Sequence, residues 1–348
     1  MPLSPRQQRV ALIIHARPGI SSSRVLEQLA EKVSLVTVKR DIALLLKEGY
    51  LISTGSGPSV AYELSLRGRL FLPLDAHAYC AVEPDKRLAS AHFNFDLFPN
   101  MPETVFTEDE RALLEKATIA YRARSGNMSK ALHEKELERF VIELSWKSSR
   151  IEGNTYTLLD TERLIREGIE APDHSRAEAT MIVNHKRAFD FVRVQRDSFA
   201  RGLDRALVEE VHRLLVEGLG VSHGVRTRVV GITGTAYRPL GNPYQIREAL
   251  KRLYARINSI FDPYSKALVA LAGLSYVQPF EDGNKRAARL IGNALLLGAD
   301  RAPLSYRSVD EVAYREAIVV FYEVQSIEPL KKIFIEQYLF SAAQYAGA

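Results

Sequence analysis

The chain has 348 residues, of which 46% are hydrophobic and 26% are charged, with 20 glycines and 15 prolines. This balance is typical of a folded globular protein and excludes a disordered, collagen-like or fibrous chain. No apolar run is long enough to cross a bilayer, and the first residues lack the pattern of a signal peptide. The single cysteine, Cys80, excludes an internal disulfide and favours a cytoplasmic protein.

The net charge of +5 comes entirely from the N-terminal fifth of the chain. Residues 1–70 contain ten Lys or Arg against five Asp or Glu, whereas the remaining 278 residues contain 37 of each class. A polyanionic partner is therefore expected at the N-terminal segment. A chain of this length is expected to form two domains, and the sequence divides into a small domain at 1–68, a connector at 69–104 and a large domain at 105–348.

The small domain is predicted to contain three helices followed by a hairpin. Pro18-Gly19 ends the first helix, and Gly49 ends the third helix, which begins after Ser34. A Gly- and Ser-rich turn separates two short segments of β-branched and aromatic residues. The predicted elements lie at about 5–15, 21–32, 34–49, 50–53 and 60–65.

This order of elements resembles the winged helix-turn-helix domain of bacterial repressors, and the resemblance implies DNA as a partner. Thr37, Lys39 and Arg40 would then lie in the half of the third helix that reaches base edges and phosphates in a major groove. Ser34 and Lys47 could add phosphate contacts. Repressors of this type bind paired half-sites, which implies a homodimer. The alternative is a protein-docking module, because winged helices also serve that purpose.

The large domain is predicted to be almost entirely helical, so the fold class is mainly α. The connector before it contains four prolines and no sustained period. One stretch, 228–239, has the apolar run and turn of a small β-hairpin. The predicted helices lie at about 108–124, 130–149, 158–167, 175–199, 204–219, 243–261, 265–277, 285–297, 308–322 and 330–345.

The densest cluster of chemically active residues lies between two of these helices, in the segment Gln278-Pro-Phe-Glu-Asp-Gly-Asn-Lys-Arg-Ala-Ala-Arg289. Gly283 permits an unusual turn, and the helix after it would present free N–H groups to the loop. Arg286 and Arg289 lie on one helical face, where both can reach one phosphate chain. Asp282 can hold Mg²⁺ against those phosphates. The segment therefore predicts a site for a phosphate chain with a metal ion.

The same segment resembles the Fic family, whose motif reads His-x-Phe-x-Asp/Glu-Gly-Asn-Gly-Arg-x-x-Arg. Six of its eight defining positions are kept, namely Phe280, Asp282, Gly283, Asn284, Arg286 and Arg289. The family transfers AMP from ATP to a hydroxyl of a target protein, so the resemblance, which runs from about Val105 onward, implies ATP and Mg²⁺ as cofactors.

The resemblance also assigns roles within the loop. Phe280 would anchor the loop in the core, Asp282 would bind Mg²⁺, and Gly283 and Asn284 would hold the α and β phosphates. Arg286 and Arg289 would hold the outer phosphates. The hairpin at 228–239 would be the flap that aligns a segment of the target protein by strand addition.

A second match, Ser148-Ser-Arg-Ile-Glu-Gly-Asn154, is similar to the family's inhibitory motif, Ser/Thr-x-x-x-Glu-Gly/Asn. The resemblance assigns the inhibitory role to Ser148, Glu152 and Gly153 on a helix end at about 148–154. Glu152 would pair with Arg289 and take its guanidinium away from the γ-phosphate.

Two departures from the motif fall where the chemistry is done. Gln278 replaces the catalytic His, and a neutral amide cannot accept the proton of the target hydroxyl near pH 7. Loss of a general base typically costs about 10² to 10⁴ in rate, so AMP transfer should be impaired while ATP binding survives. Lys285 replaces the second glycine, where it would crowd the α-phosphate pocket or add a charge to it. His185 and His212 lie in predicted helices and are expected to be structural.

The replacement by Lys285 resembles the Doc toxins, Fic relatives that transfer the γ-phosphate. Those toxins keep the His and lack a match to Arg289. Three hypotheses remain open: a regulator that binds ATP and DNA with little or no transferase activity, an active auto-inhibited AMP or phosphate transferase, and a scaffold with a vestigial nucleotide site.

Overall fold

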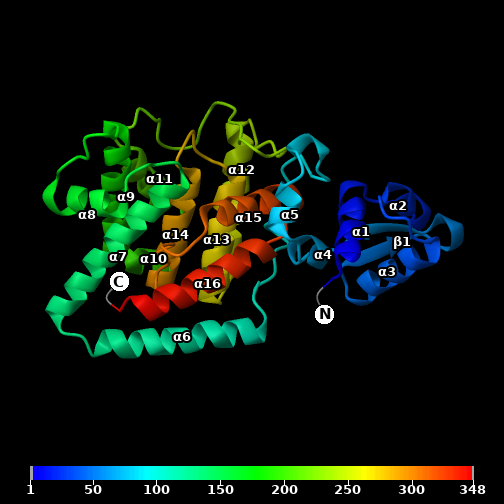
Figure 1. Ribbon diagram of the computed structural model, residues 1–348, viewed down its shortest axis with the longest axis horizontal. Helices are drawn as coiled ribbons and strands as arrows, with labels where there is room; N and C mark the ends of the chain where they lie inside the picture. Colours follow the sequence, from blue (N-terminus) through cyan, green and yellow to red (C-terminus); the bar gives the residue numbers. More distant parts are fainter. Residues whose placement is uncertain (1–2, 347–348) are drawn as a thin grey trace. The chain divides into compact units, whose positions relative to one another are not determined.

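The computed structural model describes residues 3–346 and divides into two compact units, which are drawn in Figure 1. The first unit contains Met1–Phe93, Gly231–Arg238 and Val312–Lys332, and the second contains Asn94–Val230, Pro239–Glu311 and Ile333–Ala348. The sequence boundaries after residues 68 and 104 do not coincide with this division, because two segments from the C-terminal half complete the first unit.

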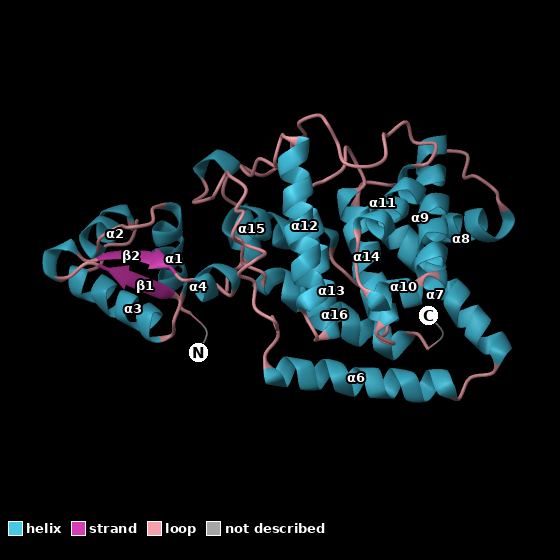
Figure 2. Cartoon of the chain, turned by 180° about the vertical axis from the view of Figure 1, so that it is seen from behind, coloured by secondary structure: helices cyan, strands magenta, loops and turns pink. Residues whose placement is uncertain are grey.

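The first unit begins with three helices and a hairpin in the predicted order. Its elements are α1 (Pro5–Ala16), α2 (Ser22–Gln28), α3 (Leu35–Lys47), β1 (Leu51–Thr54), β2 (Ala61–Leu64), α4 (Leu66–Leu70), α5 (Ala76–Cys80) and, from residue 312 onward, α15 (Glu311–Val324), with 3₁₀ turns at Gly57–Ser59 and Pro84–Lys86. The side chains of Ser4, Ser21 and Ser34 cap the first three helices. Strands β1 and β2 pair antiparallel with Leu51 opposite Leu64, as Figure 2 shows in magenta.

The core of the first unit joins the N-terminal helices to α15. Val10 of α1 and Ile42 of α3 are buried in the same cluster as Val320 and Val324 of α15. His15, at the end of α1, lies with its Nε2 3.2 Å from the backbone oxygen of Glu323. The helix α15 is thus an integral part of this unit.

A buried carboxylate ties two other segments of the first unit to α15. The Glu323 side chain accepts hydrogen bonds from Tyr79 Oη at 2.9 Å, Arg87 Nη1 at 3.2 Å, Thr235 Oγ1 at 2.6 Å and the Ala236 backbone N at 2.9 Å. Its side chain is fully buried and that of Arg87 is 6% exposed. We call these five residues the Glu323 cluster. One carboxylate therefore fixes both the segment after α5 and residues 235–236.

The predicted hairpin at 228–239 has its turn but no paired strands among the described residues. Its backbone groups are bound elsewhere. The N–H of Ala236 donates to the Glu323 carboxylate, and the N–H of Arg238 donates to the oxygen of Ala91 at 2.9 Å. These donors are not available to a neighbouring strand, so the segment is a loop.

The described residues of the second unit form helices and loops, with no strand among them. Its elements are α6 (Glu108–Gly126), α7 (Lys130–Ile151), α8 (Leu158–Glu167), α9 (Arg176–Val194), α10 (Arg196–Arg201), α11 (Arg205–Val216), α12 (Pro243–Ser259), α13 (Pro263–Val277), α14 (Asn284–Gly298) and, from residue 333 onward, α16 (Glu328–Gln344). The single helix predicted at 175–199 is two helices that meet at Gln195. No helix in the described part of the chain has the length and apolar character to cross a membrane.

Helices α13 and α14 form the centre of the second unit. α13 is buried on all sides from Ala267 to Val277, as expected for a helix that is apolar around its whole circumference. α14 is buried along nearly all its length, and α7, α9, α10, α11 and α12 pack around the pair, as Figures 1 and 2 show. The loop between α13 and α14 is therefore held at both ends by rigid, buried helices.

Candidate functional site

The loop between α13 and α14 is closed by its own side chains. The Asn284 side chain accepts a hydrogen bond from the Phe280 backbone N at 2.8 Å and donates one to the Phe280 oxygen at 2.9 Å. Phe280 is 1% exposed and its ring stacks on His212 at 3.6 Å between centroids. Phe280 thus anchors the loop in the core, in the position that the resemblance implied.

The start of α14 is open to an anion. Gly283 is its N-cap with φ at 78°, and within the described residues no side chain caps the helix. A Cβ at this position would lie 3.3 Å from Val216 Cγ1, so both the backbone angle and the space favour glycine. The N–H groups of the first turn and the helix dipole therefore face the loop without a protein acceptor on the cap.

His212 supports the loop as a neutral imidazole. Its Nε2 lies 2.9 Å from the Asp282 backbone oxygen and must donate to it. Burial and the nearby Arg286 guanidinium together lower the pKa of His212 to about 4, against the opposing backbone hydrogen bond to Asp282. His185 on α9 is also buried, and burial with Arg289 and Arg286 nearby lowers its pKa well below the usual value. Both histidines are expected to be uncharged near pH 7.

Gln278 is the residue that the resemblance aligns with the family's catalytic histidine. It is 6% exposed and adopts a left-handed conformation with φ at 50°. Its Nε2 donates to the Ser275 oxygen at 2.7 Å, while its backbone oxygen accepts from Arg226 Nε at 2.8 Å. The amide is thus turned back onto α13 and supplies no base.

Arg286 and Asp282 form an ion pair in which one side chain is buried and the other is exposed. Arg286 Nη2 lies 2.9 Å from Asp282 Oδ2, with side chains that are 1% and 63% exposed, respectively. The Nη1 atom of Arg286 is buried and has no hydrogen-bond partner among the described residues. Burial lowers the pKa of Arg286, and Asp282 and Glu152 oppose this effect. A buried guanidinium with an unpaired N–H is suited to an incoming anion.

The residues present fit Mg²⁺ only as a partner of bound phosphates. In the described part of the chain no three His, Cys, Asp or Glu side chains gather to hold a metal. Mg²⁺ usually takes one or two protein carboxylates together with substrate phosphates and water. The exposed Asp282 carboxylate meets that requirement, so Mg²⁺ would be held between it and a phosphate chain.

The structure brings Ser148, Glu152 and Arg289 together. Arg289 is fully buried, and its Nη1 lies 2.9 Å from Glu152 Oε1. Its Nε donates to Ser148 Oγ at 2.9 Å and its Nη2 to the Ser148 backbone oxygen at 2.8 Å. Glu152 is the C-cap of α7, and Gly153 follows it with φ at 98°. The expected carboxylate pair is present, while its inhibitory role stays a prediction.

Lys285 adds a contact that the motif comparison missed. Its Nζ lies 2.9 Å from Glu152 Oε2, so each oxygen of one carboxylate meets a different cation. Burial raises the pKa of Glu152, but Arg289 and Lys285 outweigh it and lower the pKa to about 2. The signal was in the sequence, because Lys285 and Arg289 are four residues apart and so share a helical face. We call Ser148, Glu152, Lys285 and Arg289 the Glu152 site.

The residues expected to bind DNA lie on α3 of the first unit. Lys39 and Arg40 are exposed, and neither forms an ion pair with any other described side chain. Thr37 is partly buried, and its Oγ1 lies 3.0 Å from the Oγ of the helix cap Ser34. Asp41 on the same helix is buried and paired with Arg6. With Lys47 at its end, the helix therefore exposes three cations while its one acid is neutralised.

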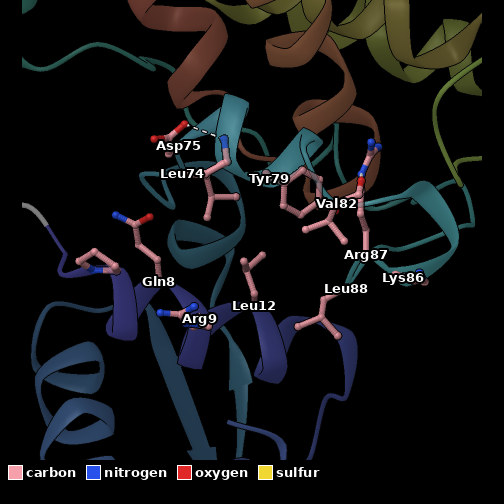
Figure 3. A pocket seen from close by; sticks show the side chains of 12 residues that line it. Gln8, Arg9, Leu12, Leu74, Asp75, Tyr79, Val82, Lys86, Arg87 and Leu88 are labelled. Atoms are coloured by element: carbon pink, nitrogen blue, oxygen red, sulfur yellow. Dashed lines mark hydrogen bonds between the residues drawn. The ribbon is translucent and has the colours of Figure 1, made fainter. Parts of the chain in front are cut away.

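The first unit also contains a cavity of about 520 Å³. Leu12, Leu74 and Leu88 are among the side chains that Figure 3 shows around it. Its charged lining residues already have partners: Arg9 pairs with Glu31, Lys86 with Glu83, and Arg87 with Glu323, while Asp75 caps α5. The cavity therefore lacks the unpaired polar group that marks the loop before α14.

Comparison with known proteins points to the same loop. Residues 202–296 match the Fic/DOC family. Protein adenylyltransferase fic-1 from Caenorhabditis elegans is 27% identical over 161 residues, which cover 44% of this chain and 31% of that protein. Protein adenylyltransferase Fic from Nematostella vectensis is 27% identical over 177 residues, which cover 49% and 41%. The chain thus spans about a third to two fifths of the length of these relatives.

Solved structures share the fold of about two thirds of this chain. Fic-1 from C. elegans has a TM-score of 0.60 at 20% identity, over 69% of this chain and 72% of that one. A Fic domain-containing signaling protein from Bacteroides thetaiotaomicron has a TM-score of 0.57 at 19% identity, over 66% and 94%. Together with the motif between α13 and α14, these matches establish that residues 202–296 form a Fic/DOC domain.

Proposed function

We propose that this protein binds ATP and Mg²⁺ at the loop before α14, with weak or no AMP-transferase activity, and couples that site to DNA binding. The observation that carries the proposal is the combination at α14 of an uncapped helix start and Arg286, whose buried Nη1 has no hydrogen-bond partner in the described residues. Both features favour a bound phosphate chain. The adenylyltransferase relatives indicate that the nucleotide is ATP.

Each residue of the loop has a part in this proposal. Gly283 and Asn284 would hold the inner phosphates on backbone and amide groups, with Lys285 beside them, and Arg286 and Arg289 would hold the outer phosphates. Asp282 would hold Mg²⁺, which neutralises phosphate charge when it is bound. Gln278 cannot take the proton of an attacking hydroxyl, since its amide is neutral and donates to Ser275. Transfer should therefore be slower by about 10² to 10⁴ than with a histidine.

Transfer of label from ATP tests the proposal. We would compare α-labelled and γ-labelled ATP with Mg²⁺, using the Glu152→Gly chain so that Arg289 is released, with and without Gln278→His. The expected result is nucleotide binding without label transfer in Glu152→Gly, and transfer of AMP after Gln278→His is added. Absence of ATP binding to the Glu152→Gly chain would contradict the proposal.

A second candidate is an active, auto-inhibited transferase that modifies a hydroxyl of a target protein. The contact between Glu152 and Arg289 favours it, because an inhibitory carboxylate has little use without an activity to restrain. The loop at 228–239 would then receive the target segment. AMP label on protein from Glu152→Gly alone would favour this reading, and label only from the γ position would indicate a Doc-like phosphotransferase.

We further propose that residues 1–68 form a winged helix-turn-helix that binds DNA as a homodimer. Thr37, Lys39 and Arg40 on α3 would face the major groove. Lys39→Ala should lower the slope of log K against log salt by about 0.9 on a 30-base-pair duplex, because one phosphate contact is lost. Lys251→Ala, an exposed lysine in the second unit, is the control and should leave the slope unchanged. A chain that fails to bind duplex DNA at low salt would contradict this part.

A further inference from the structure

We propose that Lys285 is a second cation of the anion subsite around Arg289, and that its ammonium group holds the Glu152 carboxylate in the free chain and a phosphate group once the nucleotide binds. This inference rests on the proposed nucleotide binding. It assigns to Lys285 two opposed effects, because the same ammonium group first holds the inhibitory carboxylate and then the phosphate.

The geometry of the carboxylate carries the argument. Glu152 Oε1 lies 2.9 Å from Arg289 Nη1, and Glu152 Oε2 lies 2.9 Å from Lys285 Nζ. The two cations are therefore spaced for two oxygens on one central atom. A phosphate group presents oxygens in the same way, and guanidinium groups bind carboxylate and phosphate alike.

The charge of α14 also requires an anion at this place. Lys285, Arg286 and Arg289 all lie in the first two turns of the helix, and the first turn contains no acidic residue. Cations near a helix N-terminus are unfavourable because the helix dipole is positive there. Asp282 neutralises Arg286, so Lys285 and Arg289 depend on Glu152 or on a ligand that replaces it.

The two cations differ in how firmly they are held. Arg289 is fully buried and donates to two oxygens of Ser148, so its guanidinium stays in place when Glu152 leaves. The side chain of Lys285 is 27% exposed and that of Glu152 is 16% exposed. The site is therefore open to solvent on the Lys285 side, where an incoming phosphate can compete with the carboxylate.

The opposed effects of Lys285 predict a change that depends on Glu152. In the natural chain, Lys285→Gln removes one contact to the phosphate and one contact to the carboxylate that must be displaced, so the two losses offset each other. With Glu152→Gln, only the phosphate contact remains to be lost. A hydrogen bond to a charged group corresponds to about ten-fold or more in affinity.

The experiment is a double-mutant cycle in the full-length chain, with MgATP binding measured by calorimetry. We expect Lys285→Gln to change the affinity by less than about three-fold in the natural background and to weaken it by about ten-fold or more in the Glu152→Gln background. Lys251→Gln is the matched control and should change neither. An equal loss in both backgrounds, or no loss with Glu152→Gln, would overturn the inference.

A second readout separates this inference from the proposed nucleotide function. Inorganic phosphate should raise the melting temperature of the Glu152→Gln chain, and the rise should disappear when Lys285→Gln is added. Phosphate stabilisation without ATP binding would leave the subsite standing and refute the nucleotide function. ATP binding without any effect of Lys285→Gln would support the nucleotide function and refute the subsite. The melting curves also show that each variant is folded.

Discussion

Two carboxylates, those of the partly buried Glu152 and the fully buried Glu323, have surroundings that differ in charge and in access to solvent. Glu152 meets two cations, and its side chain is 16% exposed. Glu323 is fully buried and meets one cation, Arg87, together with three neutral donors from Tyr79, Thr235 and Ala236. The first arrangement has an excess of positive charge at an opening, and the second is balanced and closed.

The difference separates an exchangeable carboxylate from a structural one. Another anion can replace Glu152, because its partners are cations and solvent reaches the site. Nothing of similar charge can enter the Glu323 cluster without breaking hydrogen bonds to two other segments of the chain. The distinction lies in the partners and their exposure, since both carboxylates are ionised groups in largely buried positions.

The largest expected effect is the loss of the Glu323 charge. Glu323→Gln leaves Arg87 buried without a counter-ion, and breaking such a pair typically costs about 3–5 kcal/mol. Glu316→Gln on the same helix is the matched control, because Glu316 pairs with a His77 side chain that is 84% exposed and such pairs contribute less than about 1 kcal/mol. Urea denaturation measures both. Equal losses in the two variants would contradict the structural role of Glu323.

A pH dependence is expected from the loop beside the Glu152 site. The folded pKa of His212 is about 4, below the ordinary 6.5, so between these values the unfolded chain binds a proton that the folded chain does not. The free energy of unfolding should fall as the pH drops from about 6.5 to about 4, by about 3 kcal/mol from this group. His212→Phe keeps a ring on Phe280 and should flatten that part of the curve.

His15 lies in the first unit, together with the Glu323 cluster, and allows the same test of pH-dependent stability. Burial lowers the pKa of His15 as well, so His15→Phe should reduce the acid sensitivity with the same sign. Thermal melts at pH 7 and pH 5 measure both variants. A pH dependence unchanged by His212→Phe would show that this imidazole is not held neutral by the fold.

The next effect is the change in stability that added phosphate produces in variants of the two carboxylates. Glu152→Gln should lower the free energy of unfolding by about 2 kcal/mol, which is less than the loss in Glu323→Gln. The loss is smaller because Arg289 keeps its hydrogen bonds to Ser148 and the Lys285 ammonium group can be hydrated. Phosphate at ten times its dissociation constant should restore about 1.4 kcal/mol. The same phosphate should leave Glu323→Gln unchanged. Stabilisation of both variants by phosphate, or of neither, would contradict the distinction between the two sites.

The helices of both units were predictable because their apolar periods and caps are local signals. The serine caps of α2 and α3 and the glycine after α3 are such signals, and the pattern at 158–167 gives α8 with its observed bounds. Asp282, Gly283, Arg286 and Arg289 were recognisable from residue type and spacing, whereas the role of Phe280 came only from the family resemblance. Glu152 was expected beside Arg289 only through the family resemblance, since 137 positions of chain separate them and no period connects them.

Two features depended on tertiary partners and could not be derived from local pattern, and a third was within reach of the sequence but was not drawn from it. The Glu323 cluster joins residues far apart in sequence, and none of its members stood out. The segment 228–239 has strand-like composition but gives its backbone donors to Glu323 and Ala91. The contact between Lys285 and Glu152 follows from helical spacing once Arg289 is placed, but Lys285 was interpreted only toward the nucleotide.

The smallest expected effect distinguishes the fixed and movable parts of the Glu152 site. Gly153 and Gly283 both have positive φ, but a Cβ on Gly153 meets nothing within 4 Å, whereas one on Gly283 lies 3.3 Å from Val216 Cγ1. Gly153→Ala should cost about 1 kcal/mol for the backbone alone. Gly283→Ala should cost somewhat more, because the loop against Val216 has little freedom to adjust. Urea denaturation of the two variants measures the difference, and a greater cost at Gly153 would mean that the end of α7 is the rigid element. Exchange of Glu152 for phosphate requires a greater cost at Gly283. The carboxylate can leave only if the end of α7 moves while the loop before α14 keeps its conformation.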